Sequence, residues 1–395
     1  MFSRRTAWTT SPSPFTAAIA DARASGRELL DLSVSNPTTV DLLHPPSLYR
    51  VVGDPDNARY EPASRGLSCA RRAVADYYRS QRGLTLDPSR ICLSASTSEA
   101  YAAAFSILAD PGDTILIPSP SYPLLGFLAD LAAITLVPYQ LAYDGAWHVD
   151  RADLRERLAA APRARAIVAI APNNPTGNYL DPATLATLDT LAAERSLALI
   201  VDEVFFDYPL AAGPHASPLD GPREALTFTL SGLSKIAALP QMKLAWTVVS
   251  GPPALIGAAL SRLEIVHDTY LSASTPTQRA APALLAAAPA IQRSIRARLR
   301  ANLKNLKNSC RGSALTPCAV EGGWTALVRL PRVGLDDLEW ARLLLARAGV
   351  IAQPGYFFDL ETPHLALSLL SPEATFRRGV DRLLTLAQQV VGSGL

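Results

Sequence analysis

The feature that most constrains the fold is a regular alternation of β-prone runs and helical stretches after Asp113. Short apolar, β-branched runs are typical of buried strands, and longer stretches with apolar residues every three or four positions are typical of helices. Strands separated by helices favour a mainly parallel sheet that helices cover on both faces. The expected strands are 114–117, 134–139, 166–171 and 198–201, and the expected helices are 123–131, 151–161 and 182–195.

Polar residues follow several of these apolar runs, at the sheet edge where α/β proteins place their chemistry. The segment 172–177, reading PNNPTG, ends one run, and Asp202 ends the next. A turn that carries Lys235 follows a further run, 227–230. An amine on such a turn, partly desolvated among apolar neighbours, has a lowered pKa and can form a Schiff base with a carbonyl. Taken alone, Lys235 is also compatible with an ordinary loop lysine.

An anion site is the second candidate feature. Ser96 and Glu99 have the spacing of a capping box at the start of a helix. The amides and hydroxyls of Thr97 and Ser98 would then bind an anion, because the helix dipole favours negative charge there. A plain helix cap without a ligand explains the same residues. Tyr60, in a turn-rich segment, either covers apolar surface or serves a site.

The last third of the chain changes pattern. A long helical stretch, 276–308, precedes a strand–helix–strand–strand–helix order that is typical of a small α+β domain. A chain of 395 residues is also long enough for two domains. The expected parts are an N-terminal arm with part of the small domain (1–48), a large domain (49–285), and a connecting helix with the small C-terminal domain (286–395).

Composition excludes several classes of protein. The formal net charge of +2 offers no basic field for nucleic acid or for a membrane surface. The alanine-rich run 280–291 is interrupted by prolines and is too short to span a bilayer. The four cysteines show neither a CxxC pair nor a histidine at ligand spacing. We therefore expect reduced thiols, no metal site and a cytoplasmic protein.

The strand ends together supply an amine at Lys235, a carboxylate at Asp202, an amide at Asn174 and a flat ring at Tyr122. Pyridoxal phosphate (PLP) needs such a set, with a phosphate cradle beside it. The motifs PSPSYP, PNNPTG, DEVF and SGLSKIAALPQMK follow one another in the order and spacing of a known family. From about Leu29 to its C-terminus, the chain resembles the class I/II aminotransferases of the fold-type I PLP enzymes.

This resemblance implies an α/β fold, with a mainly parallel sheet of the seven-stranded type between helices in a large domain and a smaller α+β domain. It implies a PLP-dependent aminotransferase (EC 2.6.1.-) that moves an amino group between an amino acid and a 2-oxo acid. Lys235 would hold PLP as a Schiff base and shuttle a proton, and Asp202 would pair with the pyridine nitrogen. Tyr60 would reach the phosphate bound by the neighbouring subunit, which implies a homodimer with shared active sites.

The resemblance assigns the remaining site residues in the same way. Asn174 would contact the phenolic oxygen of the ring and the substrate carboxylate, and Tyr122 would stack on the ring. The phosphate site would consist of Ser96, Thr97, Ser98, Ser234 and Lys243. The substrate site would include Asn174, Ser35, Tyr270, Trp324 and His364.

Three positions depart from the family pattern. Phe205 stands where a tyrosine usually donates to the ring oxygen, so this donor is missing unless Tyr208 or water replaces it. Lys243 stands where an arginine usually grips the phosphate, which substitutes a point charge for a bidentate fork. Ala366 stands where an arginine usually clamps the substrate α-carboxylate, so neutral groups would have to bind it.

The sequence leaves the reaction and the substrate open. A decarboxylase, a β-lyase or an amine transaminase on the same fold is the main alternative to an aminotransferase, and a non-catalytic PLP-binding protein is a further one. Tyr270 occupies the position of a second arginine in relatives that take dicarboxylates, which disfavours acidic substrates. Trp324, Phe357 and Phe358 would line a pocket for apolar or aromatic side chains.

Overall fold

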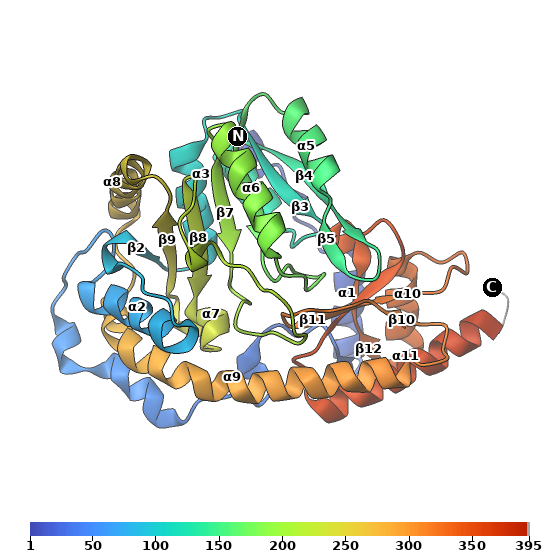
Figure 1. The fold of residues 1–395 in the computed structure, drawn as a ribbon. Coiled ribbons are helices and arrows are strands. Elements are labelled where there is room, and N and C mark those ends of the chain that lie inside the picture. Colours follow the sequence, from blue (N-terminus) through green and yellow to red (C-terminus); the bar gives the residue numbers. More distant parts are fainter. Residues whose placement is uncertain (393–395) are drawn as a thin grey trace.

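The computed structural model describes residues 1–392 and contains a large sheet and a small sheet joined by one long helix (Figure 1). The strands of the large sheet, in spatial order, are β2 (Ile91–Ser94), β9 (Ala245–Ser250), β8 (Thr227–Gly232), β7 (Ala198–Asp202), β6 (Ala164–Ile170), β3 (Thr114–Ser119), β4 (Thr135–Tyr143) and β5 (Trp147–Val149). The run from β8 to β4 is parallel throughout, and β2, β9 and β5 pair antiparallel with their neighbours. The predicted α/β fold with a mainly parallel sheet is confirmed.

The sheet has eight strands, where the resemblance implied seven. The additional strand, β5, forms a hairpin with the end of β4 through Asp144 and Gly145. Gly145 has a φ of 112°, a conformation that glycine adopts at little cost, and an Asp-Gly pair between apolar runs is a hairpin signal. The hairpin buries Trp147 against the sheet, and this apolar burial stabilises the short strand.

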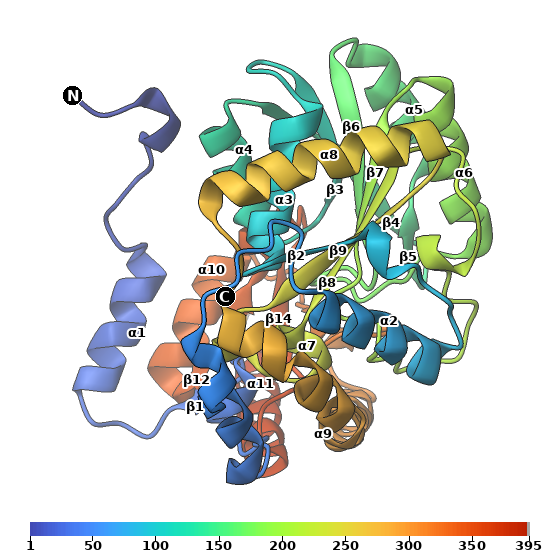
Figure 2. The same ribbon diagram turned by 90° about the vertical axis from the view of Figure 1, so that its left-hand side faces the viewer.

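Helices cover both faces of the large sheet (Figure 2). Alternate residues of one strand serve the two faces, since Ile167 packs toward one side and Ala166 and Val168 toward the other. One face carries α5 (Arg151–Ala160) and α6 (Pro182–Glu194), and the other carries α3 (Thr97–Leu108), α4 (Leu124–Ala132) and α8 (Pro253–Tyr270). Side-chain caps begin several of these helices, for example Asp181, which accepts from the amides of Ala183 and Thr184.

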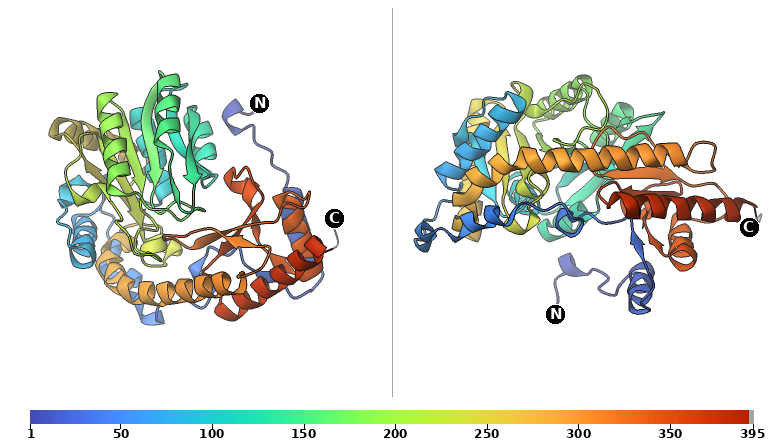
Figure 3. Two further views of the ribbon diagram at one scale, coloured as in Figure 1. Left: turned by 45° about the vertical axis from the view of Figure 1, so that its right-hand side comes forward. Right: turned by 90° about the horizontal axis from the view of Figure 1, so that it is seen from below.

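The long helix α9 (Thr275–Ser309) ties the two parts of the molecule together. Its first half, including Leu284, packs on α2 (Ser68–Arg82), and its second half, including Leu299, packs in the core of the small sheet. Figure 3 shows α11 (Glu373–Gly392) alongside this second half. None of the helices within residues 1–392 is long and apolar enough to cross a membrane.

The small sheet is antiparallel, in the order β10 (Thr316–Pro317), β11 (Thr325–Arg329), β14 (His364–Ser368) and β13 (Gln353–Pro354). Next to it, β1 (Leu30–Asp31) pairs in parallel with β12 (Val350–Ile351), which brings the N-terminal region to the C-terminal one. The helices α1 (Pro14–Ala24), α10 (Asp337–Leu343) and α11 complete this part. The domain boundaries after residues 48 and 285 stay a prediction.

Candidate active site

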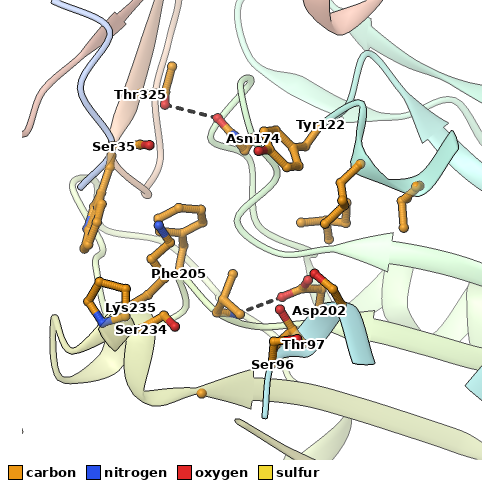
Figure 4. Close-up of a pocket in the computed structure, with 18 of the residues that line it drawn as sticks. Ser35, Ser96, Thr97, Tyr122, Asn174, Asp202, Phe205, Ser234, Lys235 and Thr325 are labelled. Carbon is orange, nitrogen blue, oxygen red and sulfur yellow. Dashed lines mark hydrogen bonds between the residues drawn. The ribbon is translucent and has the colours of Figure 1, made fainter. Parts of the chain in front are cut away.

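A cavity of about 390 Å³ lies between the carboxyl edge of the large sheet and one face of the small sheet (Figure 4). The large sheet contributes Asp202 from the end of β7 and Gly232 from the end of β8, and the small sheet contributes Thr325 and Ala366. The cavity therefore forms where two segments far apart in sequence meet. The predicted site residues that line it are Ser35, Ser96, Thr97, Ser98, Tyr122, Asn174, Asp202, Ser234, Lys235 and Trp324.

Lys235 enters the cavity from a very tight connection. It lies on α7 (Leu233–Ile236), a single helical turn that begins directly after Gly232, rather than on the open turn expected from the sequence. A Cβ atom on Gly232 would come within 2.9 Å of the Cβ of Ala245 and 3.1 Å of the carbonyl oxygen of Leu244. Glycine is required here because the end of β8 passes so close to β9.

The amine of Lys235 lies among apolar groups. Its Nζ atom is 4.8 Å from the ring centre of Trp324 and 5.3 Å from that of Phe205. Burial lowers the pKa of Lys235 to about 8, although the charge of Asp202 acts in the opposite direction. A lysine with this pKa exchanges protons readily near neutral pH and is a competent nucleophile.

Asp202 is buried at the end of β7, with 8% of its surface exposed. Burial raises the pKa of its carboxyl to about 6, while the amide of Val204, the nearby Tyr101 and the charge of Lys235 lower it. Oδ1 accepts the amide of Val204 at 3.0 Å, but within residues 1–392 Asp202 forms no ion pair. A protonated ring nitrogen would relieve this unpaired carboxylate, so the site fits the pyridine ring of PLP.

The start of α3 forms the opposite end of the cavity. Ser96 caps the helix and accepts the amide of Glu99 at 3.1 Å, as expected. The predicted capping box is incomplete, because the carboxylate of Glu99 accepts from the amide of Ala95 rather than from that of Ser96. Thr97 and Ser98 line the cavity from the first turn of this twelve-residue helix. Free amides at a helix start, with hydroxyls beside them, suit a phosphate group.

Asn174 has its orientation set by the small sheet. The hydroxyl of Thr325 donates to Oδ1 of Asn174 at 3.1 Å, which leaves the amide nitrogen of Asn174 available to a ligand. Tyr122 lies beside Asn174 (Figure 4) and is half exposed. An aromatic ring in this position can cover a flat ligand.

Four predicted site residues do not line the cavity of this chain. Tyr60 and Tyr270 are 64% and 75% exposed and lie outside the lining. Lys243 is exposed and lies outside the lining. His364 is buried at the first position of β14 and lies outside the lining, with its Nδ1 2.7 Å from the carbonyl oxygen of Thr362.

Other aromatic residues also differ from the expectation. Phe357 and Phe358 lie outside the lining: Phe358 is buried, and the half-buried Phe357 stacks on the exposed Tyr356 at 4.6 Å. The hydroxyl of Tyr208 donates to the backbone carbonyl of Lys235. Tyr208 therefore supports α7 from behind and does not replace the phenol missing at Phe205.

Several lining residues were not predicted. Tyr101 lies four positions after Thr97 on one helix face, and this spacing could have indicated it. Gln353, Thr325 and Ser368 come from the small sheet. No local sequence signal marks them, because their place in the cavity depends on how the two sheets meet.

The chain belongs to the family described as aminotransferase class I and II, whose sequence model matches residues 28–383. The family identifies PLP as the cofactor, and the geometry of Lys235, Asp202 and the start of α3 fits it. The glutamate-pyruvate aminotransferase AlaA of Escherichia coli (strain K12) is 30% identical over 258 residues, which are 65% of this chain. The match spans 63% of the length of that relative.

A longer match joins the chain to the arginine–pyruvate transaminase AruH of Pseudomonas aeruginosa, at 28% identity over 372 residues, or 93% of this chain and 92% of that protein. Among solved structures, an alanine aminotransferase from Pyrococcus furiosus superposes with a TM-score of 0.88 and 23% identity, covering 98% of this chain and all of that one. The superposition shows that the fold is shared.

Proposed function

We propose that this protein is a PLP-dependent aminotransferase (EC 2.6.1.-) that transfers an amino group between an amino acid and a 2-oxo acid. The observation that carries the proposal is the presence in one cavity of the half-buried amine of Lys235, whose pKa is lowered, and the buried carboxyl of Asp202, whose pKa is raised. When bound, PLP supplies an electron sink for charge at the substrate α-carbon. The chain supplies the groups that hold and move protons around it.

Each residue then has a role that follows from its position. Lys235, with its pKa near 8, takes the proton from the substrate α-carbon and then donates it to the cofactor, because such an amine is both acid and base near neutral pH. Asp202 keeps a positive charge on the ring nitrogen. Thr97 and Ser98 hold the phosphate, and Asn174 orients the substrate through its free amide nitrogen.

The test begins with the covalent link. Purified protein should absorb in the visible, and borohydride should fix the cofactor on the peptide that contains Lys235. Lys235→Ala should lose both the link and turnover, whereas label on Lys243 would overturn the assignment. Incubation with an amino acid should then convert the cofactor to pyridoxamine phosphate. A decarboxylase or β-lyase would release its product without accumulating that form.

The proposed amino acid is non-acidic, with an apolar or aromatic side chain. Phe205 and Trp324 give the cavity apolar walls. Tyr270 occupies the position at which relatives specific for dicarboxylates have an arginine that binds the acidic side chain of the substrate. A panel of amino acids, read by the conversion of the cofactor in a single half-reaction, tests the preference. Faster conversion by aspartate and glutamate than by leucine and phenylalanine would contradict it.

We also propose a cytoplasmic homodimer with shared sites. Exposed apolar side chains gather around the end of α8, where Ile265, Tyr270 and Leu271 are 65–75% exposed, and Tyr60 lies on a loop that is hydrogen-bonded to Ser272 through the amide of Ala63. A second copy of the chain would bury this surface. Light scattering should give twice the chain mass of 42.1 kDa. A mixture of Lys235→Ala and Tyr60→Ala proteins should regain activity only if subunits share their sites.

A further inference from the structure

The cavity has a gap at the position of the expected carboxylate clamp. Ala366 lines the cavity from β14, and its short side chain offers no hydrogen bond. In the sheet, Ala366 lies directly opposite Gln353 of β13. Directly opposed residues of antiparallel strands project from the same face with Cβ atoms about 5 Å apart. Gln353, which also lines the cavity, therefore stands beside the gap with a side chain long enough to cover it.

The amide of Gln353 is uncommitted. Its side chain is half-buried, and it makes no hydrogen bond with any part of the chain that the structure describes. The neighbouring hydroxyl of Ser368 is already used, since it donates to the carbonyl of Val34. In the same cavity, the amide nitrogen of Asn174 is likewise without a partner within residues 1–392, because Thr325 engages only the amide oxygen. Two residues with neutral N–H donors that are not engaged within residues 1–392 therefore line the cavity.

Charge in the cavity is sparse. Apart from tyrosines, the ionisable side chains in the lining contributed by residues 1–392 are Asp202 and Lys235. Lys235 is committed to the cofactor in the proposed function, and Asp202 repels an anion. An arginine fork binds a carboxylate far better than a carboxamide of the same size, whereas the hydrogen bond of a neutral donor to a carboxylate is only about twice as strong as its bond to a carboxamide. A carboxylate also loses more hydration on entry.

We propose that Gln353 determines specificity for the substituent on the α-carbon of the amino donor. It binds this substituent through neutral hydrogen bonds together with Asn174, and the site therefore accepts donors with an uncharged α-carboxamide about as well as donors with an α-carboxylate. This inference rests on the proposed function, because it concerns how the same cavity holds the substrate.

Binding of two unreactive probes to the holoenzyme tests the inference without turnover. Hydrocinnamate and hydrocinnamamide have nearly the same size and differ in charge and in the NH2 group that replaces one carboxylate oxygen. Calorimetry gives the dissociation constant of each. Wild type should bind the two within about threefold of each other. Gln353→Ala should weaken both by roughly fivefold, the value of one neutral hydrogen bond. Gln388→Ala, on the exposed side of α11, is the matched control and should change neither.

Two further variants separate a direct contact from a structural effect. Gln353→Glu keeps the shape but places a carboxylate beside the probe, so hydrocinnamate should weaken by more than about thirtyfold while hydrocinnamamide changes little. Ala366→Arg should tighten hydrocinnamate alone by at least about tenfold. A wild-type preference for the acid above about thirtyfold would overturn the proposal, because a fixed cation would then be present. An equal response of both probes to Gln353→Glu would also overturn it.

The outcome is separable from that of the proposed function. If no amino acid converts the cofactor but the probes follow the expected pattern, the aminotransferase proposal fails and the binding role of Gln353 stands. If amino acids convert the cofactor and L-phenylalaninamide is rejected while L-phenylalanine is accepted, the reaction stands and the neutral recognition by Gln353 fails.

Discussion

The titration of Lys235 gives the most direct measure of the environment inside the cavity. Burial lowers its pKa from the ordinary value of 10.5 to about 8. At pH 7, an amine with a pKa of about 8 is neutral in roughly one molecule in ten, against roughly three in ten thousand for an ordinary lysine. The reactive neutral fraction of Lys235 is therefore about 300-fold larger at this pH.

Competitive acetylation can measure this shift in cofactor-free protein. Brief pulses of acetic anhydride across a pH series, followed by mass spectrometry of the digested protein, give the extent of modification at each lysine. The other three lysines, Lys243, Lys304 and Lys307, are exposed and serve as internal references. Lys235 should show a midpoint near pH 8, well below the ordinary lysine value of 10.5.

Asp202→Asn provides the second arm of this experiment. The carboxyl of Asp202 has a pKa of about 6, so it is ionised where Lys235 titrates, and its charge raises the pKa of the amine. Removing that charge should move the midpoint of Lys235 further down. A wild-type midpoint at the ordinary value of 10.5 would refute the desolvation argument. An upward shift in Asp202→Asn would refute the assigned sign of the interaction.

Three more predictions concern neighbouring residues. Cofactor-free Asp202→Asn should be more stable than wild type at pH 7.5, by up to about 3 kcal/mol in the free energy of unfolding, because the raised pKa of Asp202 contributes stability below pH 3.8 that is lost as the pH rises through about 6. Urea unfolding below pH 3.8 should show little difference between the two proteins. Phe205→Tyr should place a phenol near the amine of Lys235, whose Nζ lies 5.3 Å from the centre of the Phe205 ring. A spectral pH titration of the cofactor in the holoenzyme should then show a lower midpoint than in wild type. Gly232→Ala should lower the free energy of unfolding, measured in urea, by about 1–3 kcal/mol, because the added Cβ would lie 2.9 Å from Ala245. Gly257→Ala is the control and should lose no stability, because nothing lies within 4 Å of its added Cβ.

Local sequence patterns were enough to predict the framework of the large sheet. Apolar runs alternating with helical stretches predicted the parallel strands, and the residues directly after them, Asn174, Asp202 and Lys235, all line one cavity. The prediction succeeded because each of these residues follows a strand closely in sequence, and the carboxyl ends of parallel strands all lie at the same edge of the sheet. The edge strand β5 was missed, although the pair Asp144-Gly145 signals a hairpin.

Residues from distant segments met only through tertiary structure. Tyr208 looked like a substitute for the phenol missing at Phe205, but its hydroxyl donates to the carbonyl of Lys235 outside the cavity. Tyr60 and Tyr270 lie too far out to meet the cavity of their own chain. Direction and exposure of such side chains depend on packing, which no local pattern encodes.

The sequence by itself determined which groups are available: an amine, a carboxylate, an anion-binding helix start, and the lack of an arginine at Ala366. Only the tertiary structure decided what stands beside Ala366. The two-residue strand β13 has no periodic pattern, and its pairing with β14 sets Gln353 opposite Ala366. A shift of one residue in that register would turn Gln353 to the other face of the sheet, because side chains alternate along a strand.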